Sequence, residues 1–178
     1  TQKENLLKNS SDGRIRGQRL GALANKEKRE KEIELVKTSS KKEIQSVNLE
    51  ILRVAGAMLY WAEGTKKSST AVTNSDPRLI KFIVIWFKKI FNITPDRLNA
   101  HLHIHYGNDE LKIKRFWSRL TGIPLKNFGK SFIKPKGTGH RTNILPNGIF
   151  RMRVIGRGTE DLRHKILSWS EKVCELTI

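Results

Sequence analysis

The stretch GAMLYWAEGTKKSS, residues 56–69, carries one acid, Glu63, at the end of an apolar segment with helical character. Gly64 closes this segment, and Lys66 and Lys67 follow. Negative charge is disfavoured at a helix C-terminus, because the unpaired carbonyl groups there are themselves partly negative. Glu63 therefore needs a cation nearby, which is either one of the two lysines in a local ion pair or a bound divalent metal.

Three histidines, His101, His103 and His105, alternate with apolar residues in the stretch RLNAHLHIHY. A β-strand would project all three imidazoles to one side, about 7 Å apart along its length. Two such imidazoles are suitable ligands for zinc or another transition metal. The alternative interpretation is that the histidines contact phosphates or base edges, or only decorate the surface of a sheet.

Other catalytic motifs are weak or absent in this sequence. His105 and Asn108 resemble part of a histidine-asparagine-histidine nuclease, but the helix expected after residue 108 lacks the histidine that binds the metal. The sequence contains no phosphate-binding loop, no nucleophile elbow and no Cys/His pair for covalent catalysis. GTGHRTN, residues 137–143, is more typical of a DNA-contacting or disordered loop than of a nucleotide site, and no small-molecule substrate is expected.

Two predicted strands, residues 97–106 and 149–156, each have one apolar and one basic face. The apolar faces need a covering layer of helices, which the periodicity predicts at residues 48–64, 75–92, 108–122 and 159–176. We therefore expect an α+β fold with a mixed or antiparallel sheet, helices on one face and a basic open face. The open face is expected to carry Arg97, Asn99, His101, His103, His105, Arg151 and Arg153.

The composition indicates a polyanionic partner. The 178 residues include 35 Lys and Arg against 17 Asp and Glu, for a net charge of +18 and a pI near 10.3. Nucleic acid is the leading candidate, whereas a membrane is not expected, because the basic residues are spread over the chain and the apolar runs are short. The single cysteine fits a reducing compartment. We expect a cytoplasmic protein associated with the nucleoid.

The chain is expected to divide at residue 47. Residues 1–47 hold scattered apolar positions and no aromatic residue, so they cannot form a core alone. Within them, GRIRGQR offers Arg14, Arg16 and Arg19 between glycines. This basic segment is either a solvated helical linker or an arm that follows phosphates. Residues 48–178 are expected to form the α+β domain.

AMLYWAEG, residues 57–64, resembles the LAGLIDADG motif of homing endonucleases, a helix that ends in acid-glycine and leads into a strand. Ala57, Leu59, Ala62 and Glu63 match the motif in register, as does the glycine that follows. The chain is also similar over nearly its full length to uncharacterised bacterial proteins that often carry an upstream helix-turn-helix. The resemblance covers the segments GAMLYWAEGTK, NSDPRLIKFIVIWF, HLHIHY and FWSRLTGIP in this order.

The resemblance implies a homodimer in which two motif helices pack together and two sheets form a saddle over double-stranded DNA. It implies Mg²⁺ at Glu63 and hydrolysis of phosphodiesters, with Lys134 as a second catalytic residue. Relatives of this fold that regulate transcription without cleavage provide the alternative, and an RNA-binding protein is a third possibility. The other expected DNA contacts are Lys66, Lys67, Lys136, Arg151 and Arg153.

Overall fold

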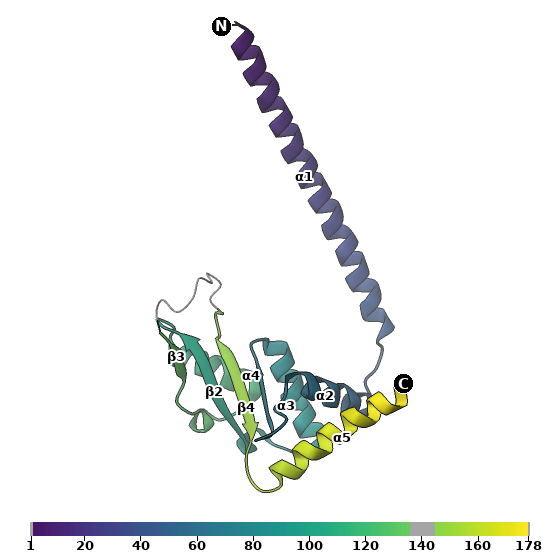
Figure 1. Cartoon of the computed structure of the whole chain (residues 1–178), viewed down its shortest axis with the longest axis vertical. Coiled ribbons are helices and arrows are strands. Elements are labelled where there is room, and N and C mark those ends of the chain that lie inside the picture. Colours follow the sequence, from purple (N-terminus) through teal and green to yellow (C-terminus); the bar gives the residue numbers. More distant parts are fainter. Residues whose placement is uncertain (1, 136–144, 178) are drawn as a thin grey trace. The chain divides into compact units, whose positions relative to one another are not determined.

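The computed structural model describes residues 2–135 and 145–177, and the chain divides into two compact units, 1–47 and 48–178 (Figure 1). Lys136 and the loop GTGHRTN lie outside the described residues. Within the described part, no helix has both the length and the apolar character needed to cross a membrane.

The first unit contains a single helix, α1 (Gln2–Glu43). The segment GRIRGQR is therefore helical, although its glycines had favoured a flexible arm as one of two interpretations. Helical geometry places Arg16 and Arg19 on one side, because residues three apart are neighbours on a helix, and Arg14 on another. All three side chains are exposed. Ion pairs between neighbouring turns, such as Arg29 with Glu32 at 3.4 Å, line the same helix.

Among the described residues of the second unit, four α-helices form its helical part. The first turns of three of them are stabilised by capping side chains, since Asn48, Asp76 and Asp109 each accept a backbone N–H at the start of a helix. Gly122 ends the third of them in the left-handed conformation, with φ of 76°. The helices are α2 (Leu49–Glu63), α3 (Pro77–Phe91), α4 (Glu110–Thr121) and α5 (Thr159–Thr177), with 3₁₀ turns η1 (Pro95–Arg97) and η2 (Leu125–Asn127).

Four strands form one mixed sheet in the order β1-β4-β2-β3. The strands β1 and β2 pair antiparallel with β4, and β3 pairs parallel with β2. The α+β class and the basic strands are thus as expected from the sequence, and of the two kinds of sheet expected the structure has the mixed one. The strands are β1 (Ala71–Asn74), β2 (Leu98–His105), β3 (Phe132–Lys134) and β4 (Ile149–Val154).

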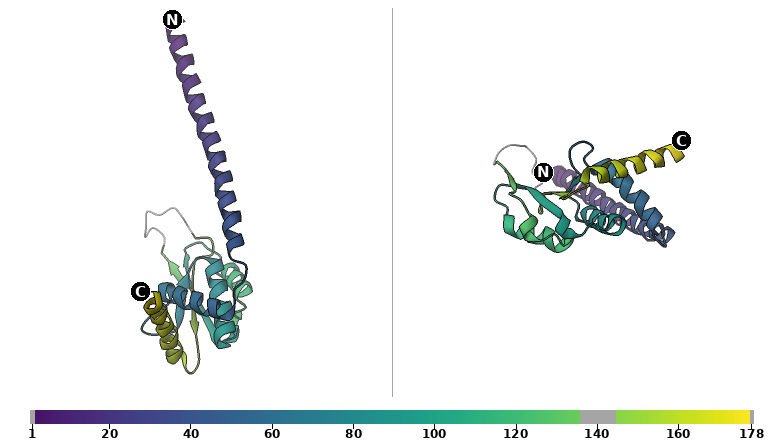
Figure 2. Two further views of the ribbon diagram at one scale, coloured as in Figure 1. Left: turned by 90° about the vertical axis from the view of Figure 1, so that its right-hand side faces the viewer. Right: turned by 90° about the horizontal axis from the view of Figure 1, so that it is seen from below.

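One face of the sheet is covered by helices. Figure 1 shows α4 behind β2 and β4 and α3 beside them, and α5 packs along α2, as Figure 2 shows from two further sides. The covered face buries alternate residues of β2 and β4, including Leu98, Leu102, Phe150 and Met152, none of which is exposed. The Trp117 ring stacks on Phe150 with ring centroids 4.5 Å apart. Burial of these apolar side chains provides the main stabilisation of the unit.

The helix α2 approaches its neighbours very closely at Gly56. A Cβ atom at this position would lie 2.0 Å from Nε1 of Trp86, a fully buried residue of α3. At the end of the same helix, a Cβ atom on Gly64 would lie 2.7 Å from the ring of Tyr60. Both glycines are therefore required by packing. The first lets the indole lie against the α2 backbone, and the second lets the chain turn past a buried phenol.

Candidate nucleic-acid interface

The open face of the sheet is the surface opposite the helices, and it carries most of the basic residues predicted from the strands. The register pairs Asn99 with Arg153 and His101 with Arg151 across β2 and β4. At the far edge, His105 pairs with Lys134 of β3. Because paired residues point to the same side of a sheet, these side chains share one face. The open face is made by Thr73, Asn99, His101, His103, His105, Phe132, Lys134, Ile149, Arg151 and Arg153.

The open face has a hollow of about 290 Å³ near its centre. Side chains from three neighbouring strands and from the segment before β3 reach it, and most of them are cationic or aromatic. A concave surface lined by cations concentrates anionic ligands, because its positive potentials add. The lining residues are His101, Leu102, His103, Lys130, Phe132, Arg151 and Arg153.

The three histidines of β2 occupy different surroundings. His101 is half-buried and packs against Gly129, where an added Cβ would lie 2.4 Å from its ring. His103 is exposed, and its ring lies 5.4 Å from the Phe132 ring. Among the described residues, no group of three His, Cys, Asp or Glu side chains is placed to hold a metal ion. Of the two interpretations of these histidines, ligation of zinc or another transition metal therefore gains no support here.

Phe132, Ile149 and Lys130 belong to this surface, although the sequence did not indicate them. Phe132 is 59% exposed and Ile149 37% exposed, and both pair with His103 from opposite sides. The strand β3 has only three residues, too few for its alternation to reveal which face Phe132 occupies. The stretch KSFIKPK does contain a signal for an exposed aromatic residue in a basic surface, because its two apolar residues lie between lysines.

Other predicted DNA contacts lie outside the open face. Arg97 belongs to η1, and its Nη2 donates to the carbonyl oxygen of Ile155 at 3.2 Å. Lys66 donates to the carbonyl oxygen of Gly64 at 2.8 Å, so it satisfies the end of α2. Lys67 is exposed in the loop that follows. The structure thus assigns Arg97 and Lys66 local structural contacts, which the sequence interpretation did not anticipate.

Glu63 is exposed at the end of α2 and is hydrogen-bonded to a neutral group. Its Oε2 accepts from Nδ2 of Asn74, at the end of β1, at 3.1 Å. Lys66, which had been a candidate partner, bonds carbonyl groups instead. The carboxylate is therefore oriented by an amide and remains open to solvent.

The two predicted catalytic residues do not share a site within one chain. Glu63 contacts β1 through Asn74, whereas Lys134 belongs to β3, and these strands form opposite edges of the sheet. Neighbouring strands lie about 4.8 Å apart, so three strand spacings, on the order of 14 Å, separate the two edges. Within one chain, Glu63 and Lys134 therefore lie at opposite edges of the sheet.

Asp76 is close to Glu63 in space, but its carboxylate is already paired with another residue. Its side chain caps α3 and forms an ion pair with Arg78 at 2.9 Å. Hydrogen bonds from Arg78 lower the pKa of the Asp76 carboxyl below its ordinary value. Asp76 is therefore an ionised partner of arginine rather than a second free carboxylate beside Glu63.

The outer face of α2 is an apolar stripe that points away from the core. Its members recur three or four residues apart, while Leu52, Gly56 and Tyr60 on the other side of the helix are buried. Ile51 and Trp61 are each 49% exposed, and Val54 is 38% exposed. A helix that is apolar on both sides is normally buried on both sides. The outer face of α2 consists of Ile51, Val54, Ala55, Met58, Trp61 and Ala62.

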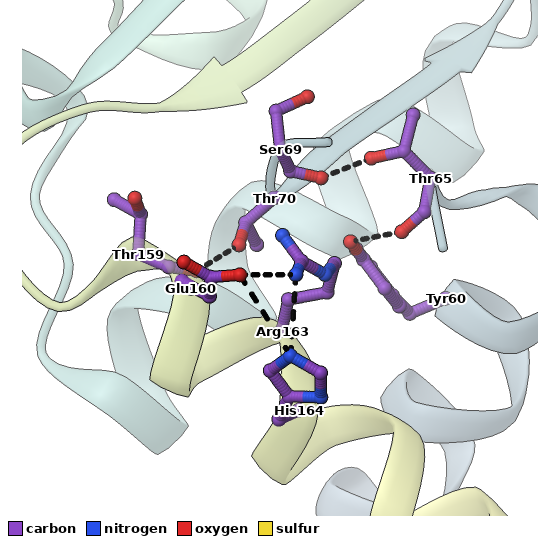
Figure 3. Close-up of polar contacts among 8 residues, drawn as sticks. All are labelled: Tyr60, Thr65, Ser69, Thr70, Thr159, Glu160, Arg163 and His164. Atoms are coloured by element: carbon purple, nitrogen blue, oxygen red, sulfur yellow. Dashed lines mark hydrogen bonds and ion pairs between the residues drawn. The ribbon is translucent and has the colours of Figure 1, made fainter. Parts of the chain in front are cut away.

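A polar cluster joins the start of α5 to the loop after α2, next to the open face (Figure 3). Arg163, only 4% exposed, pairs with Oε1 of Glu160 at 3.1 Å. The Thr70 hydroxyl donates to the Thr159 carbonyl oxygen. A hollow of about 320 Å³ lies beside Arg163 and is also lined by Arg153. The cluster therefore holds together the elements that surround the Arg153 end of the open face.

Tyr60 belongs to the same cluster, at the point where α2 meets the loop. Its hydroxyl donates to the carbonyl oxygen of Thr65 at 2.8 Å. Burial raises the pKa of the Tyr60 phenol above its ordinary value of 10.0, although nearby hydrogen bonds and the charge of Arg163 oppose the shift. The phenol therefore stays protonated at neutral pH and serves as a donor that fixes the turn after Glu63.

Comparison of the chain with protein-family models, with curated proteins and with solved structures gives no match.

Proposed function

We propose that this protein binds double-stranded DNA through the open face of its sheet. The observation that carries the proposal is the gathering of Lys134, Arg151 and Arg153 with three histidines on an uncovered surface. Half or more of protein–DNA hydrogen bonds go to phosphates and sugars, and cationic side chains supply much of the binding energy. The net charge of +18 supports the same class of partner.

A homodimer assembled on the outer face of α2 is part of this proposal. Exposed apolar patches on soluble proteins mark interaction sites, and the outer face carries Ile51, Val54 and Trp61 without a covering element in its own unit. Ala55 and Ala62 are small enough to let a second helix approach closely. A twofold pair would use the same stripe from both chains, as closed dimers do.

A glutamate at position 54 is expected to turn the dimer into a monomer. Val54 is 38% exposed, so Val54→Glu leaves the single chain folded but places two charges face to face in the helix pair. Light scattering after size-exclusion chromatography measures the mass. The control is Leu111→Glu, a similarly apolar position on α4 with 51% exposure, which should stay dimeric. A monomeric wild-type protein at all tested concentrations would rule out the assembly.

Cleavage of the bound DNA is the second part of the proposal. Support comes from the LAGLIDADG-like arrangement, in which α2 ends at Glu63 and Gly64, and Gly64 bridges to Val72 of β1. The core is proposed to be LAGLIDADG-like on this basis. The competing function is a regulator that binds DNA without cutting it.

Mg²⁺ would be held at this centre as an ion shared by two chains. Mg²⁺ is bound by oxygen ligands, commonly one or two carboxylates with several waters. One chain supplies the Glu63 carboxylate, oriented by Asn74, while Asp76 is engaged by Arg78. The second carboxylate would be Glu63 of a second copy. When bound, the ion would stabilise negative charge on the phosphate oxygens. Glu63 would hold it, and Asn74 would keep the carboxylate in place.

Replacement of Glu63 by glutamine is expected to abolish nicking of supercoiled plasmid in Mg²⁺ while DNA affinity is kept or rises. Glutamine preserves the shape and the contact with Asn74 but removes the charge that a metal requires. Agarose gels measure nicking, and gel shifts measure binding. Glu50→Gln, at the other end of α2, is the matched control and should cut normally. If wild-type protein binds the plasmid and leaves it intact in Mg²⁺ and Mn²⁺, the regulator is favoured.

A further inference from the structure

Phe132 occupies an unusual place for a large apolar side chain. It is 59% exposed on the open face and lies among cations, since Lys130, Arg151 and Arg153 line the same hollow. Its ring centroid lies 5.4 Å from that of His103, with the ring planes tilted by 53°. More than half of the Phe132 side chain is thus accessible, which makes it available to a ligand.

The register shows that Phe132 belongs to a row that crosses three strands. His103 of β2 is flanked by Ile149 of β4 on one side and by Phe132 of β3 on the other. A cation lies on each side of this row: Arg151, opposite His101, comes before it, and Lys134, opposite His105, comes after it. An aromatic and apolar row is thus placed between two rows of charge.

This alternation is the pattern by which proteins hold unpaired nucleotides. Cations follow the backbone of the strand, and exposed aromatic rings stack on its bases. A fully paired duplex hides the faces of its bases and presents only their edges, so a phenyl ring on its surface reaches a thymine methyl group at most. An unpaired base offers a whole face for stacking. A ring that stands free on a basic sheet therefore suits an unpaired base better than a paired one.

We propose that Phe132, supported by His103, stacks on an unpaired base, so that the open face prefers DNA with single-stranded or unpaired nucleotides over perfectly paired duplex. This inference rests on the proposed function, because it assigns the DNA to the same open face. It narrows that function by naming the feature of the DNA that is recognised. Lys130 and Arg151, which share the hollow, would hold the phosphates next to the stacked base.

Fluorescence anisotropy with three labelled DNAs of equal length tests the proposal: a full duplex, the same duplex with a short unpaired stretch, and a single strand. Wild-type protein is expected to bind the two probes with unpaired bases more tightly than the duplex. Phe132→Ala should weaken binding of those two probes by about 5- to 150-fold and weaken duplex binding much less. Phe132→Tyr should keep the preference, since it retains the aromatic face.

Ile133→Ala is the matched control for this experiment. Ile133 is the adjacent residue of β3 and is 48% exposed, but it points to the other face of the sheet. Its replacement should leave all three affinities unchanged, which separates stacking from a general disturbance of the edge strand.

The outcomes distinguish this inference from the function on which it rests. Equal losses on all three probes in Phe132→Ala, or no loss on any, would overturn the stacking assignment while DNA binding stands. Binding of the single strand alone would overturn the proposed binding of double-stranded DNA while the stacking assignment stands. Failure of wild-type protein to bind any of the three DNA probes would overturn both. Exclusive binding of a single-stranded RNA of the same sequence would overturn the assignment to DNA.

Discussion

Replacement of Gly56 by alanine is expected to destabilise the 48–178 unit strongly. The added Cβ would lie 2.0 to 2.2 Å from three atoms of the Trp86 indole, where real Cβ contacts do not occur. Trp86 cannot move aside easily, because it is fully buried and packs against Phe87 and Phe91 with ring centroids 5.1 and 5.2 Å away. Thermal and denaturant-induced unfolding measure the effect.

The sizes of two opposing free-energy effects decide whether Gly56→Ala stabilises or destabilises the protein. Alanine is favoured over glycine inside a helix by about 1 kcal/mol, so propensity alone would predict a stabilised protein. Overpacking of a core costs about 1–3 kcal/mol for extra methylenes that the surroundings can accommodate, and more where they cannot. A typical domain is stable by only about 5–15 kcal/mol. We therefore expect the steric term to dominate, with a loss above about 3 kcal/mol.

Two further variants test whether the loss of stability in Gly56→Ala comes from the overlap with Trp86. Gly17→Ala in α1 adds the same atom where nothing lies within 4 Å, so it should not destabilise the protein. Trp86→Leu together with Gly56→Ala should lose less stability than the two single changes added together, because the smaller side chain relieves the overlap. A Gly56→Ala protein that unfolds at the wild-type temperature would contradict the packing described for α2 and α3.

Removal of the two arginines of β4 is expected to give the largest loss of DNA affinity. Arg151 and Arg153 lie on neighbouring cross-strand pairs of the open face, and both line its hollow. Arg151→Gln with Arg153→Gln should weaken binding of DNA by about 10- to 100-fold. The slope of log K against log salt should fall by about 1.8, which is two cations at about 0.9 each for duplex DNA.

Arg115→Gln with Arg119→Gln is the matched control, because it removes the same charge from the exposed side of α4, which packs behind the sheet. Fluorescence anisotropy over a range of salt concentrations measures both pairs of variants. The control should change affinity and slope much less. Equal effects of the two double variants would indicate a diffuse response to net charge, and the open face would lose its assigned role.

Secondary structure in this protein follows from signals that neighbouring residues carry. Asp76 and Pro77 mark the start of α3, and Gly122 marks the end of α4. The alternation of apolar and polar residues in RLNAHLHIHY predicts that Leu102 is buried and that His103 lies on the open face. This prediction does not require the partner strands to be known. These features depend on backbone geometry and on side-chain periodicity over a few residues, so the sequence alone predicts them.

Which strands pair with each other depends on contacts between distant residues, and a local sequence pattern does not reveal these contacts. The sequence left a mixed and an antiparallel sheet equally open, because the pairing of Ala71 with Arg153 joins residues far apart in the chain. The parallel pairing of β3 with β2 places Phe132 beside His103 and separates Lys134 from Glu63 by the width of the sheet. These relations require the assembled sheet.

The helix α2 also shows which features the sequence predicts and which depend on the tertiary structure. The sequence GAMLYWAEG predicted a helix, and the acid at its end predicted a local cation or a metal. Tertiary structure decided which side each residue faces, since Gly56 lies against Trp86 whereas Ala55 remains exposed. It also gave Glu63 the amide of Asn74 as its partner. Sequence thus determined the helix, its charge and its periodicity. Packing between elements distant in the chain determined its neighbours, because only folding brings those elements together.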